Sequence, residues 1–171
     1  MPKNVRCNIE DHRLLTDGVK VEDVTTITPP NVTHPTVSVK AAGMVMDVDM
    51  PNMYHFDAME LSIAHNNGTN CDMLLVPGTH NIECRAARQN YDVAGVALDL
   101  EMVKIRAVVV HKSTEKGTIE AGNPYGSTEK YSVVRYEEEQ NGEVIVLIDS
   151  MAGIIRIKGQ DYSSVLTSML D

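Results

Sequence analysis

Apolar and polar residues alternate along most of this chain, and a period of two is the pattern of β-strands rather than helices. In Thr36–Lys40, for example, Val37 and Val39 fall on one face and polar residues on the other. The pattern therefore predicts a mainly antiparallel β fold. The strands expected on this basis are Val19–Ile27, Thr36–Lys40, Met59–Ile63, His80–Arg88, Val96–Val110, Ser127–Glu138, Val144–Ile148 and Ile154–Lys158.

The longest expected strand, Val96–Val110, changes phase in its middle. Its first half has an apolar face, predicted to point inward, that consists of Val96, Leu98, Leu100 and Met102. Asp99 and Glu101 fall on the opposite face. After Met102 the alternation shifts by one residue, which predicts a β-bulge or a strand that passes from one sheet to another.

The connections complete a one-domain prediction for residues 1–171. Asn141-Gly142 between two apolar runs is a strong hairpin signal, and Asn70 is placed to cap a short helix over Cys71–Val76. We expect an antiparallel β-sandwich or barrel with one short flanking helix. Residues 1–17 are expected as an N-terminal arm, residues 43–57 as a long loop, and residues 162–171 as a C-terminal arm or short helix.

The bulk composition limits the possible functions. A formal net charge of −9 argues against binding of nucleic acid through phosphate neutralisation, although an acidic surface lets DNA pass without adhering. The three cysteines, Cys7, Cys71 and Cys84, form no CxxC pair and are expected to be reduced thiols. The sequence shows no signal peptide and no run of about 20 apolar residues. We expect a soluble protein made in the cytoplasm, with no membrane partner.

No catalytic, cofactor-binding or metal-binding motif is found. The six histidines occur singly, without the spacing of zinc ligands. A calcium loop that started at Asp47 would need Gly at position 52 and Glu at position 58, which are Asn52 and Ala58 here. The run Glu137–Glu139 beside a hairpin turn is typical of a solvated surface. The sequence therefore predicts that the protein is not an enzyme.

Methionines cluster in the predicted loop at residues 43–57. A long apolar loop in a small domain is uncommon and is often functional, and methionine adapts well to imperfect interfaces. The loop either folds back onto its own core or, as we favour, buries against a neighbouring subunit. The residues expected to make this contact are Met44, Met46, Met50, Met53, Tyr54 and Phe56.

Taken in order, these segments resemble the major tail tube proteins of contractile phages from about Val19 to the end of the chain. The segments that carry the resemblance are Val24–Pro30, Val39–Met50, Met59–Ile63, Met73–Leu75, Lys104–Ala107, Gly117–Gly122, Asn141-Gly142, Val146–Met151 and Ile157–Asp161.

The resemblance implies a tail-tube fold, similar to that of secretion tubes, whose six copies form a ring and whose rings stack into a hollow tube. The implied partners are other copies of the chain, the sheath, the baseplate hub, the tape measure and the tail terminator, with DNA only as cargo. Two long hairpins, near Thr36–Ser62 and Val96–Tyr136, would form the inner wall. On these strands we expect Glu60, Ser62, Asp99 and Glu101 to face the lumen.

Two alternatives stay open from the sequence. A secretion-system tube, a tail-like bacteriocin tube or the tube of another contractile injection machine would use the same kind of subunit in another particle. A monomeric β-sandwich module that binds a ligand such as carbohydrate is the runner-up, although aromatic residues make up only 4% of the chain.

Overall fold

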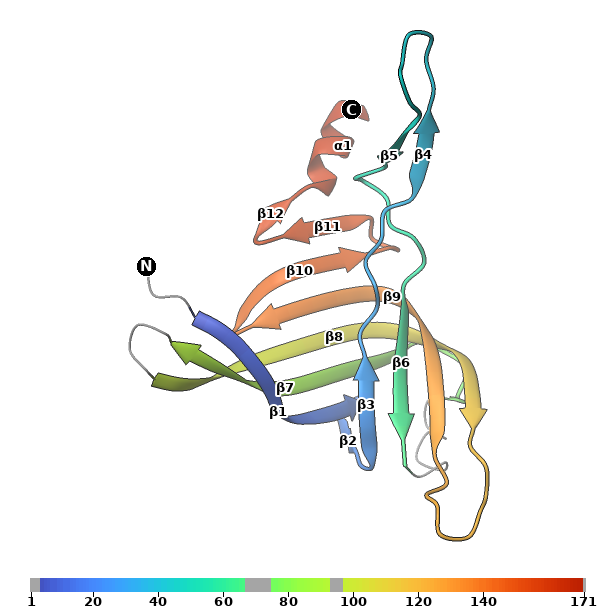
Figure 1. Ribbon diagram of the computed structural model, residues 1–171, viewed down its shortest axis with the longest axis vertical. Helices are drawn as coiled ribbons and strands as arrows, with labels where there is room; N and C mark the ends of the chain where they lie inside the picture. The colour runs from blue at the N-terminus through green and yellow to red at the C-terminus, as the bar shows by residue number, and fades with distance from the viewer. Residues whose placement is uncertain (1–3, 67–74, 93–96, 171) are drawn as a thin grey trace.

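The structure is a computed structural model, and it describes residues 4–66, 75–92 and 97–170 (Figure 1). One large antiparallel sheet and a separate two-stranded ribbon account for the strands of this part of the chain. Among the described residues, no helix has the length and apolar character needed to cross a membrane. The elements are β1 Asn4–Thr16, β2 Val19–Val21, β3 Val24–Thr28, β4 Thr36–Val39, β5 Val48–Pro51, β6 Glu60–His65, β7 His80–Asp92, β8 Ala97–Lys116, β9 Ser127–Gln140, β10 Glu143–Asp149, β11 Ile154–Ile157, β12 Gln160–Asp161 and α1 Ser163–Leu170.

The large sheet runs in the order β12-β11-β10-β9-β8-β7-β1-β2 and branches at β9. Residues Ser127–Ser132 of β9 pair with β6, whereas Arg135–Gln140 pair with β10. A register shift in the β8–β9 ladder separates the two halves, and such a shift bends a strand. The branch carries β3 and β6 away from the main path, so the sheet curls around its own core.

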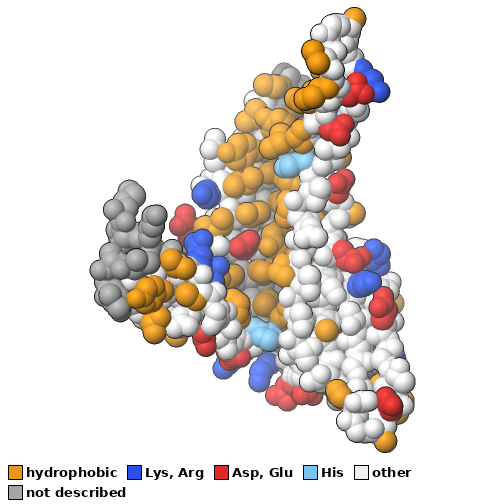
Figure 2. All heavy atoms as spheres, in the orientation of Figure 1, with side chains coloured by type: hydrophobic (Ala, Val, Ile, Leu, Met, Phe, Trp, Pro, Cys, Tyr) orange, Lys and Arg blue, Asp and Glu red, His pale blue; other side chains and the backbone are white. Residues whose placement is uncertain are grey.

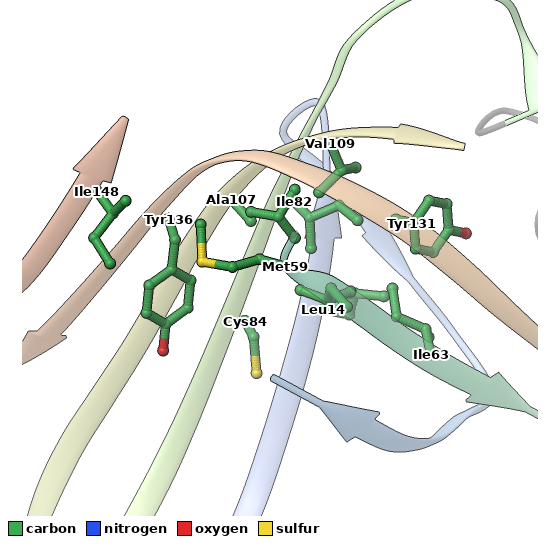
Figure 3. Packing of buried hydrophobic residues seen from close by; sticks show 12 residues of the cluster. Leu14, Met59, Ile63, Ile82, Cys84, Ala107, Val109, Tyr131, Tyr136 and Ile148 are labelled. Carbon is green, nitrogen blue, oxygen red and sulfur yellow. The ribbon is translucent and has the colours of Figure 1, made fainter. Parts of the chain in front are cut away.

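The core lies inside this curl. Leu14 of β1, Ile82 of β7 and Val109 of β8 are almost completely buried, and Figure 3 shows their side chains converging on Met59, just before β6. Phe56 and Val146 pack against the edge of this cluster. Aliphatic side chains from β1, β6, β7, β8 and β9 therefore build most of the core, and Tyr131 and Tyr136 of β9 are buried with them.

Most predicted strands are confirmed, and the Asn141-Gly142 turn links β9 to β10 as expected. Both turn residues have positive φ, +49° and +85°, which this two-residue turn requires. The predicted strand Val19–Ile27 is divided into β2 and β3 at Asp23, whose φ is +61°. The helix predicted over Cys71–Val76 begins outside the described residues. The C-terminal segment forms the helix α1, one of its two predicted forms.

Residues 1–17, expected as an N-terminal arm, contain a sheet strand. β1 pairs with β7 from Asn4↔Asp92 to Thr16↔Ile82, with two irregularities on the way. Its inner residue Leu14 is 1% exposed. The segment is therefore an integral part of the core and not an appendage.

The predicted facing of β8 is wrong in its first half. Leu98 and Leu100 are 67% and 65% exposed, while Glu101 is only 7% exposed. The β7–β8 register is unbroken from His80↔Val109 to Asp92↔Ala97, so the expected phase change after Met102 does not occur. Instead, the irregularities of β8 lie nearer its other end, at Val108/Val109 and His111/Ser113 in the ladder with β9.

Candidate functional site

The predicted loop at residues 43–57 forms an arm rather than an irregular loop. Strands β4 and β5 pair from Thr36↔Pro51 to Val39↔Val48, and an ion pair of 2.8 Å between Lys40 Nζ and Asp47 Oδ2 closes the turn above them. This hairpin projects beyond the main sheet (Figure 1). We call the segment from Thr33 to Asp57, which joins β3 to β6, the hairpin arm.

The base of the hairpin arm is tied by hydrogen bonds and by one ring contact. Asp57 N donates to Thr33 O at 2.8 Å, and Asn52 N donates to Pro35 O at 2.8 Å. The rings of His34 and Phe56 lie 4.6 Å apart. These contacts define the position of the base while leaving the tip to extend into solvent.

The arm presents apolar side chains to solvent. Of the six predicted contact residues, Phe56 packs against the core, and the other five are exposed. Val45 at the tip is completely exposed, and Met46 is 72% exposed. The alternative in which the loop folds onto its own core is therefore contradicted for the tip. Large exposed apolar patches are often interaction sites, so the arm is a candidate for one.

The helix α1 is a second apolar surface, which the sequence analysis did not identify. None of its eight residues is buried, and it contains no charged residue. Met169 and Leu170 are 77% and 87% exposed. Asp161 caps its first turn, accepting hydrogen bonds from Ser163 N at 2.9 Å and Ser164 N at 3.3 Å, which lowers the pKa of this carboxyl group through its bonds to Ser163 and Ser164. Val165 and Leu166 are 38% and 37% exposed, so this charge-free helix leaves apolar side chains in contact with solvent and is a candidate for a surface that a partner covers.

The hairpin arm and α1 emerge at the same end of the molecule (Figure 1). On the face seen in Figure 2, apolar side chains form a band that continues beside the arm toward this end. Ile157, the last residue of β11, is also 39% exposed. One end of the subunit is therefore much more apolar on its surface than an isolated small protein needs.

The face of the sheet that points away from the core carries paired charges. Arg106 of β8 lies between Glu83 of β7 and Glu137 of β9, with its Nε 3.3 Å from Glu83 Oε2 and its Nη1 2.5 Å from Glu137 Oε1. Lys104 pairs with Glu139 at 3.1 Å. The bond to Glu137, ahead of the other contacts, raises the pKa of the Arg106 guanidinium. We call this surface, on the side away from the core, the charged face.

The four residues predicted to face the lumen do not share one face. Glu60 and Ser62 alternate with the buried Leu61 and therefore lie on the charged face, where Glu60 pairs with Lys112. Glu101 is buried on the core side, and Asp99, two residues away, alternates to the same side. A lumen lined by one face of the sheet can therefore include Glu60 and Ser62, or Asp99 and Glu101, but not all four.

The described residues contain no group of three or more His, Cys, Asp or Glu side chains that could hold a metal ion. On the charged face the polar clusters are ion pairs between neighbouring strands, and the carboxylates of Glu83, Glu137 and Glu139 have Arg106 or Lys104 as partners. Such an arrangement stabilises a sheet and gives no candidate nucleophile with an attached base. Among the described residues, the exposed apolar hairpin arm is therefore the candidate site.

Comparisons with known proteins agree with this reading. The family model described as "Phage tail tube protein FII" matches residues 7–170. No curated protein sequence matches the chain. Among solved structures, the chain resembles one from the cryo-EM structure of an extracellular contractile injection system, the PVC sheath–tube complex in its extended state. The TM-score is 0.50 at 10% sequence identity, over 75% of this chain and 87% of that one.

That structural similarity supports the fold, and the match of the family model covers nearly the whole chain. The chain belongs to the phage tail tube protein FII family, and it is a structural protein of a phage tail or tail-like particle and not an enzyme.

Proposed function

We propose that this chain forms the inner tube of a contractile phage tail or a phage-tail-like particle. In this proposal six copies make a ring, and the rings stack into a hollow tube through which DNA or an effector passes. The observation that carries it is the exposed apolar hairpin arm beside the charge-free helix α1. Each buried Val, Leu or Met side chain gains about 1.5–3 kcal/mol, and a polymer repeats this gain at every subunit.

Two neighbouring subunits can contact each other through different surfaces. A ring is built from head-to-tail contacts, in which one patch of a subunit meets a different patch of its neighbour. The hairpin arm and α1 are two such patches with compatible chemistry, because both expose apolar side chains. We infer that Met44, Met46, Met50, Met53 and Tyr54 contact a neighbouring subunit, whereas Phe56 fixes the base of the arm.

For the lumen, we infer that the charged face lines the tube. Its Glu60 and Ser62 are then the lumen residues, while the buried Glu101 serves the fold. Acidic and basic side chains on this face pair with one another, so a passing polyanion meets largely neutralised charge.

The outer partners follow from the same proposal. The similar solved structure is a sheath–tube complex, and we expect this chain likewise to contact a sheath. The baseplate hub, the tape measure and the tail terminator are expected at the ends and inside of the tube. The subunit is expected to be made in the cytoplasm of the bacterial host and to end in the particle, with DNA only as cargo.

The test is electron microscopy of purified protein beside a variant with a shortened arm. Val39 and Val48 are register partners, so residues 40–47 can be replaced by Asn-Gly to form a two-residue turn without disturbing the four strand pairs. We expect rings or tubes from the natural chain and separate subunits from the variant, at unchanged thermal stability. Monomers from the natural chain at all concentrations, even when tail baseplates are added as nuclei, would contradict the proposal.

A further inference from the structure

The core contains an acid and a base that lie almost in contact. His65 at the end of β6 and Glu129 on β9 each have a side chain that is only 1% exposed, and His65 Nε2 lies 3.9 Å from Glu129 Oε2. The hydroxyl of Tyr131, which is 0% exposed, donates a hydrogen bond to the same carboxylate oxygen. Ionisable side chains are rarely buried this deeply in a core built from aliphatic residues.

Several polar atoms of this cluster have no partner within the described part of the chain. They are both ring nitrogens of His65, Glu129 Oε1 and Ser127 Oγ. Ser127 is the register partner of His65, so the unpartnered atoms lie together between β6 and β9. A buried polar atom without a hydrogen bond costs about 1–3 kcal/mol. Replacing buried ionisable groups by apolar residues of similar volume is often neutral or stabilising, so stability alone does not explain the cluster.

The cluster lies where the branch of the sheet is attached. Strand β6 pairs with β9 through six residue pairs, from Glu60↔Ser132 to His65↔Ser127. On its other edge β6 pairs with β3, and His65 is there the partner of Val24. Because the hairpin arm connects β3 to β6, these two strands form the stem of the arm. The stem is held to the main sheet by the β6–β9 pairing.

The charge state of His65 depends on its surroundings. Burial lowers the pKa of the imidazole, and the negative charges of Glu129 on β9 and Asp23 before β3 oppose this effect in part. Two other titratable side chains face the cluster among the described residues. The Tyr131 hydroxyl is bound to Glu129, and the ring of His111 on β8 packs edge-on against the Tyr131 ring at 5.8 Å. At neutral pH the imidazole is therefore uncharged. A proton added to it creates a cation whose Nδ1–H lacks a partner, and this cation is accommodated better when the strands part and water enters.

We propose that His65, Glu129 and Tyr131 form a proton-operated latch that holds the β3–β6 stem, and with it the hairpin arm, to strand β9. At neutral pH the latch is closed. Uptake of one proton from mildly acidic solvent favours an open form, in which β6 separates from β9 and His65 is hydrated. The latch is a property of the single subunit and does not depend on the proposed tube.

Hydrogen exchange of the monomeric protein tests the latch. The pH is lowered from 7.5 to 5.0, and exchange rates are corrected for the intrinsic effect of pH. A group whose pKa is lowered by folding makes the folded form lose stability as pH falls below the unfolded value of about 6.5. We expect protection of the amides of residues 60–65 to fall by up to tenfold per pH unit, the limit for one proton, while amides of residues 103–107 on β8 keep their protection.

Two variants identify the group responsible. In His65→Leu the acid-induced loss of protection should disappear, whereas His12→Gln, a change of a histidine on β1 outside the core cluster, should behave as the natural protein. If His65→Leu does not fold, the NMR titration of the His65 ring in the natural protein replaces it, with an expected midpoint below 6.5. Unchanged protection of residues 60–65 down to pH 5.0, the same loss in His65→Leu, or a His65 midpoint at or above 6.5 would each overturn the proposal.

Discussion

Arg88 on β7 and Glu101 on β8 form an ion pair in which Arg88 Nε donates to Glu101 Oε2 at 3.1 Å. Asn90 and Asn141 donate to the same carboxylate, at 3.2 and 3.4 Å. The Glu101 side chain is 9% exposed, and its contact with Arg88 is the main reason that its pKa is lowered. One carboxylate thus joins β7, β8 and the turn after β9.

Replacing this carboxylate should destabilise the subunit. We expect Glu101→Ala to lower the free energy of unfolding by about 2 kcal/mol, because the Arg88 guanidinium and two amides lose their acceptor. Urea denaturation at pH 7 measures the change. Glu60→Ala is the matched control, since the Glu60–Lys112 pair is exposed to solvent and should matter much less. Equal losses in the two variants would show that Glu101 does not join the strands as described.

A charge at the tip of the hairpin arm should block assembly without affecting folding. Val45 and Met46 contribute nothing to the core, so we expect Met46→Asp to unfold at the same temperature as the natural chain. The variant loses the burial of one apolar side chain at each subunit contact, which costs about 1.5–3 kcal/mol. Its association between subunits should therefore be at least tenfold weaker. Sedimentation over a concentration series measures this. Met46→Leu keeps an apolar side chain and should assemble normally; a defect in this variant as well would argue against a hydrophobic contact.

The pair His80–Asp17 should make stability depend on pH above about 6.5. His80 Nε2 lies 2.8 Å from Val76 O and its Nδ1 lies 3.0 Å from Asp17 Oδ2. The carbonyl of Val76 first, and then Asp17, raise the pKa of His80. A raised pKa gives stability that is complete below about pH 6.5 and is lost as the pH rises through the folded value.

The comparison of His80→Gln with the natural protein isolates this effect. In urea denaturation, the natural chain should exceed the variant in stability at pH 6, and the difference should shrink toward pH 8.5. The sign is opposite to that of His65, so the two histidines can be separated by their pH ranges. A difference that stays constant from pH 6 to 8.5 would mean that His80 contributes only as a neutral side chain.

The two described cysteines should differ in reactivity. Burial raises the pKa of Cys84 to about 11, so fewer than about one in a thousand of its thiols is ionised at pH 7.5, and only the thiolate reacts rapidly. Cys7 is exposed. In a Cys71→Ser background, we expect an aromatic disulfide reagent to label one thiol quickly and a second only on unfolding. Adding Cys7→Ser should remove the fast phase, and a persistent fast phase would place Cys84 at the surface.

The sequence by itself determined most of the strands and the Asn141-Gly142 turn, because both depend on neighbours in the chain, but it did not predict β1 or β5. Alternation of side chains located β4, β6, β7, β8 and β9 to within a few residues, and Asn141-Gly142 predicted its turn through the positive φ that these residues tolerate. The cluster of methionines at residues 43–57 indicated an interaction surface, and five of the six residues chosen there are exposed.

Only the tertiary structure decided which face of a strand is buried and where the sheet branches. Alternation shows that Leu98 and Leu100 share a face, but the unbroken register with β7 places that face opposite to Val109 and the core. The same register buries Glu101, which the sequence placed in a lumen. The His65–Glu129 contact joins residues 64 positions apart, and no local pattern encodes it. Periodicity fixes which residues lie together on a strand, whereas burial depends on which strands pair across the whole chain.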